Sequence, residues 1–128
     1  MDEISLGVPR PILDALPEEG VDAGADMKRV VASWQERVNE AIAAADTDRE
    51  AVAAITDVIE ELESRRDRYD EFVVELRAWG QSPIYAIAWR NLYMDLLAQI
   101  YEHDDLDEQV ERERNVRLVE DGIRLGEQ

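Results

Sequence analysis

Carboxylates are the side chains through which this sequence could do chemistry, because no other reactive group is present in number. Two acidic pairs have a spacing that places both carboxylates on one face of a helix: Glu60 with Glu63, and Glu102 with Asp105. Hard divalent cations such as Mg²⁺ take oxygen ligands, so two such pairs on facing helices could hold one. Since 31 of the 128 residues are acidic, pairs of this spacing also arise by chance. We expect them to form a solvated acidic face.

The two pairs resemble the ExxE and ExxD metal ligands of small all-α nucleoside-triphosphate pyrophosphohydrolases. This resemblance implies a Mg²⁺-dependent enzyme in which Glu60, Glu63, Glu102 and Asp105 converge. A pyrophosphohydrolase is therefore the alternative function. The only cluster of basic residues, Arg65, Arg66 and Arg68, lies among acids, and we expect it to form ion pairs rather than a phosphate site.

Several other kinds of site are excluded by residue types that are missing from the sequence. The absence of cysteine excludes disulfides, thiolate zinc sites and cysteine nucleophiles. The single histidine, His103, cannot supply a site that needs two imidazoles, and we expect it to lie at a helix end. There is no glycine-rich phosphate loop and no G-x-S-x-G motif. The sequence thus predicts no cofactor, no catalytic or metal-binding residue, and a protein that is not an enzyme.

The charge of the chain indicates the solvent in which it works. The formal net charge is −17, the acids are spread over the whole sequence, and Lys28 is the only lysine among 14 basic residues. Such a chain repels itself at ordinary ionic strength, whereas molar salt shortens the Debye length to about 3 Å. The composition resembles that of proteins from salt-accumulating halophiles. We expect a location in the cytoplasm of such a cell, or in a virion assembled there, without direct contact to nucleic acid.

The hydrophobic periodicity predicts an all-α fold, a three- to four-helix antiparallel bundle with a long second helix. We place the helices at about residues 26–45, 48–79, 83–103 and 105–121 of a bundle domain, 26–128. Thr47 and Glu50 form a capping box before the second helix. Gly80, Ser82 and Pro83 then fit a helix C′, N-cap and N1 position, which predicts a tight antiparallel hairpin.

Residues 1–25 are predicted to be an extended arm, because prolines and glycines concentrate there. The arm nevertheless carries six large apolar side chains, which a dangling tail would not need: Ile4, Leu6, Val8, Ile12, Leu13 and Leu16. The arm either folds back over its own bundle or docks on another subunit. We take these six residues as the candidate partner-binding residues, with protein subunits of a homo-oligomer or hetero-assembly as partners.

No signal peptide or membrane span is expected from the sequence. The first ten residues begin acidic and lack an apolar core. The most apolar stretch, from Ile84 to Ile100, is interrupted by Arg90, Asn91 and Asp95, which does not suit a spanning helix.

One short segment resembles a known structural family. In residues 96–105 (LLAQIYEHDD) an apolar helix closes with Tyr101 and Glu102, as in the head–tail adaptor (connector) proteins of tailed viruses. That resemblance implies a small all-α subunit of a ring beneath the viral portal. The sequence as a whole predicts a non-enzymatic structural or interaction subunit of a larger assembly in a halophilic system, with the virion neck as its narrower place. A small regulatory protein-binding module is a further alternative.

Overall fold

The computed structural model describes the backbone of residues 1–126 and the side chains of residues 1–19 and 22–122. Its helices are α1 (Arg10–Asp14), a 3₁₀ turn η1 (Glu18–Gly20), α2 (Val21–Ala44), α3 (Asp48–Ala78), α4 (Ile84–Tyr101) and α5 (Leu106–Gly126). No strand occurs in residues 1–126. The predicted all-α class is confirmed for this part of the chain.

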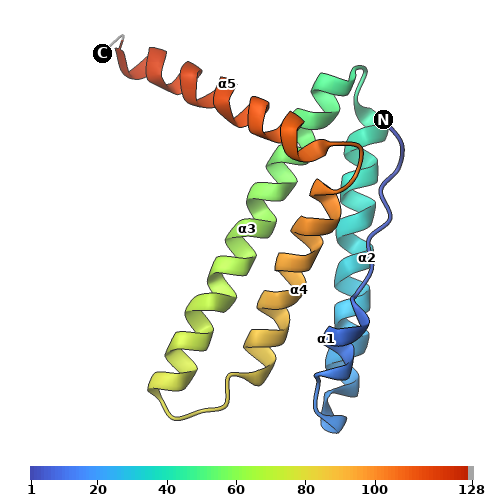
Figure 1. Ribbon diagram of the computed structural model, residues 1–128, viewed down its shortest axis with the longest axis vertical. Coiled ribbons are helices and arrows are strands. Elements are labelled where there is room, and N and C mark those ends of the chain that lie inside the picture. Colours follow the sequence, from blue (N-terminus) through green and yellow to red (C-terminus); the bar gives the residue numbers. More distant parts are fainter. Residues whose placement is uncertain (127–128) are drawn as a thin grey trace.

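Helices α2, α3 and α4 lie side by side, and α5 leaves them near the end at which the N-terminus lies (Figure 1). The core between the three long helices is made of fully buried aliphatic side chains: Met27, Val38, Ile55, Ile59, Leu62, Leu92, Leu96 and Ile100. Leu106 and Val110 of α5 join the same core. The first turn of α5 is therefore fixed to the rest of the molecule.

Helix α2 begins at Val21, earlier than the predicted start near Asp26. Glycine disfavours a helix interior, and Gly24 lies in this first turn, so the sequence favoured a later start. That prediction was wrong. Gly24 is buried against Leu13 and Leu16, and a Cβ at this position would lie 3.3 Å from Leu13 Cδ2. The close packing of the preceding segment on Gly24 compensates for its low helix propensity.

The start of α3 shows the predicted cap in a slightly altered form. The Thr47 hydroxyl accepts a hydrogen bond from the Glu50 amide at 3.2 Å. The Glu50 carboxylate accepts one in return, from the amide of Asp46 at 2.9 Å. From this cap α3 runs for 31 residues, a length of about 46 Å.

The turn between α3 and α4 closes α3 as predicted but starts α4 differently. Gly80 has a φ of 71°, and the amides of Gly80 and Gln81 bond to the carbonyls of Arg77 and Leu76. This is the Schellman arrangement, which favours glycine at C′. The N-cap of α4 is Pro83, without a side-chain cap, so the prediction of Ser82 as N-cap was wrong.

Aromatic rings fill the space between α3, α4 and α2. Tyr69 stacks on Trp89 and on Tyr93, with ring centroids 6.0 and 5.8 Å apart. Trp34 of α2 meets Tyr93 edge-on at 6.3 Å. Each contact joins two different helices, so this cluster sets how α4 lies against its neighbours.

Helix α5 follows a sharp turn and then crosses α3. Asp104 and Asp105 have positive φ values of 45° and 57°, a conformation that acidic residues tolerate better than most. The helix extends through Gly122 to Gly126, beyond the predicted end near residue 121. Past the crossing it projects away from α2, α3 and α4 (Figure 1).

Candidate interaction surfaces

The acidic pairs do not come together as the pyrophosphohydrolase resemblance implies. Glu63 pairs with Arg114, and Glu60 lies 3.4 Å from Arg117. Glu102 and Asp105 are exposed at the turn that follows α4. Among the residues whose side chains are described, no group of three or more His, Cys, Asp or Glu could hold a metal ion. In this fold Glu60 and Glu63 attach α5 to α3.

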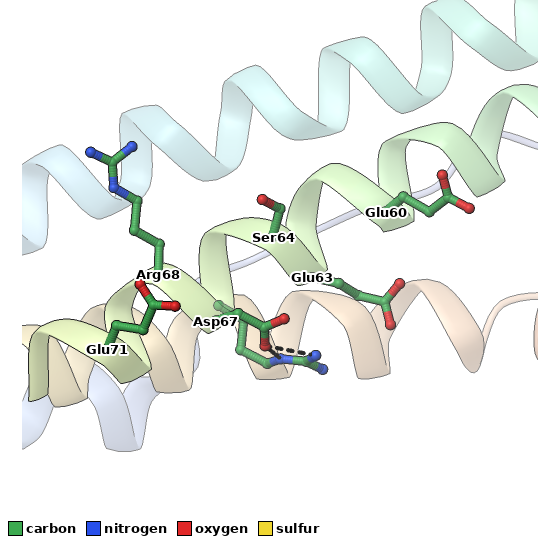
Figure 2. A pocket seen from close by; sticks show the side chains of 7 residues that line it. Glu60, Glu63, Ser64, Asp67, Arg68 and Glu71 are labelled. Atoms are coloured by element: carbon green, nitrogen blue, oxygen red, sulfur yellow. Dashed lines mark hydrogen bonds and ion pairs between the residues drawn. The ribbon is translucent and has the colours of Figure 1, made fainter. Parts of the chain in front are cut away.

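Glu60 and Glu63 also line a shallow hollow on α3, together with neighbouring residues of the same helix. It is lined by Glu60, Glu63, Ser64, Arg66, Asp67, Arg68 and Glu71. Figure 2 shows the carboxylates spread along the helix instead of converging, and Asp67 pairs with Arg66 at 3.0 Å. The hollow therefore has the character of a solvated surface of mixed charge.

Of the basic cluster on α3, Arg66 forms an ion pair with Asp67, whereas Arg65 and Arg68 form none with another described residue. The other contacts beside this cluster are local and of modest strength. The Arg37 guanidinium of α2 lies 2.6 Å from the Glu61 carboxylate, and this hydrogen bond lowers the pKa of Glu61. Arg68 lies over the ring of Phe72, 5.7 Å from its centroid. Because these groups are exposed to solvent, each contact contributes little to stability.

The N-terminal arm packs on the chain's own helices. Ile4 and Leu6 are only 2% and 9% exposed and belong to the core formed by α2, α3 and α4. Val8, Ile12 and Leu16 are half-buried and pack against that core. Of the two possibilities for the arm, the structure has the one in which it folds back over its own subunit. The apolar side chains at residues 4 and 6 are therefore inaccessible to a neighbour in this state.

Three side-chain amides hold the backbone of the arm. Asn39 of α2 accepts a hydrogen bond from the Ile4 amide at 2.8 Å and donates one to its carbonyl at 3.0 Å. Gln35, one turn earlier, accepts from the Leu6 amide at 2.8 Å. Gln99 of α4 binds the amide and the carbonyl of Gly7, both at 2.9 Å. These bonds satisfy backbone groups that a strand would pair within a sheet, so the alternating apolar pattern at residues 4, 6 and 8 needs no strand partner.

Large apolar side chains are exposed at the two opposite ends of the molecule. Trp79 is 75% exposed at the α3–α4 turn, where Ile84 and Tyr85 are also exposed. At the other end, Leu118 and Val119 on the projecting part of α5 are 68% and 63% exposed. Where exposed apolar side chains adjoin one another they mark contact surfaces.

A pocket of about 310 Å³ lies between α5 and the first turns of α3. It is lined by the buried Val52, the exposed Val116, and Arg49 and Arg112. Gln109 and Glu113 complete the lining. The charged groups of the pocket are mixed in sign, since Glu113 pairs with Arg117 at 3.1 Å and Arg112 with Glu108 at 3.7 Å. We name these residues (Arg49, Val52, Arg112 and Val116) the α3–α5 pocket.

Comparison with known proteins places the chain in a family. A family described as a family of unknown function, DUF7971, matches residues 1–127. The chain belongs to this family. No curated protein and no solved structure matches it. The DUF7971 match covers the arm together with all five α-helices.

Within this DUF7971 chain, no described helix is both long and apolar enough to span a bilayer. His103 lies in the turn after α4, as expected for a helix-end residue, with its Nε2 3.3 Å from an Asp104 carboxylate oxygen. The sequence did not single out Gln35, Asn39 or Gln99. Their one local signal is that Gln35 and Asn39 are four residues apart, which places both amides on one face of α2.

Proposed function

We propose that this protein is a non-enzymatic structural subunit that works by contact with other protein subunits. The observation that carries the proposal is the exposure of large apolar side chains at both ends, Trp79 at one and Val119 at the other. The acids that could have served catalysis support it too. Glu60 and Glu63 are occupied by Arg117 and Arg114 and hold an element in place.

The setting of this assembly is a medium of high salt. With a net charge of −17, copies of the chain repel one another unless salt screens them, and at molar ionic strength the Debye length falls to about 3 Å. Apolar contacts are not weakened by such screening. We therefore place the subunit in the cytoplasm of a salt-accumulating halophile or in a virion assembled there.

Our narrower proposal is a ring in the neck of a tailed virus. It rests on the resemblance of residues 96–105 to head–tail adaptor proteins, and on two different apolar surfaces at opposite ends of one molecule. Surfaces of that kind associate head to tail, which produces rings when the rotation closes and filaments when it does not. We further take α2, α3 and α4 as an antiparallel bundle, with the arm as part of the subunit.

The test is the mass of the full chain in solution, measured by sedimentation equilibrium in molar KCl over a range of concentrations. We expect species heavier than the 14.7 kDa monomer, with a fraction that rises with concentration. Val119→Asp should reduce this association, because it places a charge on the projecting helix. Ser33→Asp adds the same charge at an exposed position of α2 and should not. A wild-type chain that stays monomeric throughout would overturn the proposal.

A further inference from the structure

We propose that the surface of α2 and α4 that holds the N-terminal arm also holds the arm of a second copy of this chain, so that neighbouring subunits exchange arms. We call this surface the arm site and define it by Gln35, Asn39 and Gln99, together with the core side chains beneath Ile4 and Leu6. The inference rests on the proposed function, because it names one contact between subunits, the partner and the residues that make it.

The polar contacts of the arm site are made to the backbone of the arm. Asn39 binds the amide and the carbonyl of Ile4, and Gln99 does the same for Gly7. Residues 2–8 make no backbone–backbone hydrogen bond with another described residue. Proteins that bind extended peptides as added strands hold the peptide backbone in this way and select its side chains at alternate positions. The arm site is therefore a peptide-binding surface in which side-chain amides take the place of a strand edge.

The side chains of the arm provide the specificity. Ile4 and Leu6 are buried in the core, whereas Glu3 and Ser5 are exposed. Successive side chains of an extended segment point to opposite sides, so only residues two positions apart enter the core. Because protein interiors are closely packed, side chains of another size would fit less well. The arm of a second copy carries the same isoleucine and leucine at the same spacing and fits the site without any change.

The segment that ties the arm to α2 is held less firmly than the arm itself. Helix α1 has five residues, none of them buried, and its N-cap Pro9 makes no side-chain cap bond. The apolar residues Ile12 and Leu13 of α1 are only half-buried, and a helix this short is marginal by itself. Once α1 unwinds, the ten residues 7–16 span about 33 Å, about three helix diameters. An arm on this tether reaches the arm site of a molecule that lies beside its own.

Arm exchange gives two acidic molecules a contact that needs no complementary charge. Each copy has a net charge of −17, so new contacts between their outer surfaces are opposed by repulsion. The arm instead meets the same side chains in either molecule, and its buried area and hydrogen bonds are the same within a chain and between chains. Exchange of an identical element is for this reason a low-cost route to oligomers. The second copy is therefore the occupant that the arm site fits best.

The first test uses the absence of cysteine from the chain. One full-length variant carries Gly7→Cys in the arm, where an added Cβ has no other atom within 4 Å, and another carries Gln99→Cys in the arm site. The two are unfolded together in urea, refolded in molar KCl and treated with a short bismaleimide, which joins neighbouring cysteines. We expect covalent dimers that contain one copy of each variant. In the control, Ser33→Cys at an exposed position of α2 replaces Gln99→Cys and should give far fewer.

The second test removes the arm from every arm site. Ile4→Asp in the full chain places a carboxylate where the core needs an apolar side chain, so sedimentation equilibrium in molar KCl should show association about thirty-fold weaker, the size of a hot-spot loss. Ser5→Asp adds the same charge at the neighbouring exposed position and should associate like wild type. Circular dichroism checks that both variants fold. The cysteine test contains no change at Ile4 and decides the question if Ile4→Asp unfolds.

The outcomes separate arm exchange from the function on which it depends. If wild type assembles while the mixed cysteine variants give no more dimers than the Ser33→Cys control, each arm stays on its own chain, and exchange is refuted while the structural role stands. A folded Ile4→Asp chain that associates like wild type refutes exchange as well. If wild type stays monomeric at every concentration, both proposals fail.

Discussion

At the scale of single residues, the least expected feature is the use of side-chain amides as partners for an extended backbone. Asn39 serves both polar groups of Ile4, and Gln99 serves both of Gly7. Gln99 is itself held by Asp95, whose carboxylate accepts from Nε2 at 2.6 Å. The amides therefore bind the backbone of the arm, while the core takes the side chains of Ile4 and Leu6.

Replacing Asn39 by alanine should destabilise the fold by about 1–3 kcal/mol, because the partly buried amide and carbonyl of Ile4 both lose their partner. Urea unfolding in molar KCl measures this loss. Asn115→Ala is the matched control at an exposed position of α5, and its effect should stay within about 0.5 kcal/mol. Equal effects of the two substitutions would show that the amide contacts do not hold the arm.

Burial of Tyr93 predicts a loss of stability at alkaline pH. Burial raises the pKa of Tyr93 above its ordinary value of 10.0, and the same cause raises the pKa of Tyr101. The unfolded chain therefore releases these protons first. The contribution of both tyrosines is complete below pH 10 and is lost as pH rises through their folded-state pKa values.

Chemical unfolding at pH 8 and at pH 11 measures this loss. Tyr93→Phe should make the fold less sensitive to alkaline pH, since phenylalanine has no proton to release. Tyr85→Phe removes a hydroxyl from a half-exposed ring and serves as the control. An unchanged pH dependence in Tyr93→Phe would contradict this account of the buried ring.

At the scale of elements, the sequence predicted those features that depend on local chemistry. The Thr47 cap and the Gly80 turn were both predicted, because each is specified by residues within one helical turn of the boundary. The start of α2 was not, since it depends on Leu13 and Leu16 packing on Gly24 across a turn. The amide contacts to the arm could not be predicted either, because Gln99 and Gly7 are 92 positions apart.

Two glycines should respond to alanine with opposite signs. Gly80 has a φ of 71°, so Gly80→Ala should cost about 1 kcal/mol or more. Gly122 lies inside α5, and a methyl group added there would have no other atom within 4 Å, so Gly122→Ala should stabilise that helix by up to about 1 kcal/mol. Thermal unfolding in molar salt gives both signs. A stabilising Gly80→Ala would exclude the Schellman turn described above.

At the scale of the whole molecule, the acidic surface predicts a fold that salt stabilises. The melting temperature should rise steadily between about 0.15 M and about 3 M KCl, as the Debye length falls from about 8 Å to below 3 Å. Differential scanning calorimetry measures the rise.

A variant with fewer surface acids tests the cause of that stabilisation. Glu40, Glu71 and Glu120 are exposed and make no ion pair with another described residue. Their combined change to glutamine lowers the repulsion, so the variant should gain less from salt than wild type. A melting temperature that does not depend on salt, or an equal gain in the variant, would argue against electrostatic screening.

The central claim is that this protein acts through contacts at its two ends. Its most direct test is hydrogen exchange of the full chain in molar KCl, compared at low and at high protein concentration. We predict slower exchange on assembly in two places, the projecting part of α5 around residues 112–122 and the α3–α4 turn around residues 76–82, with the middle of α2 unchanged. Identical exchange at both concentrations, in a chain that sediments as a monomer, would contradict the account.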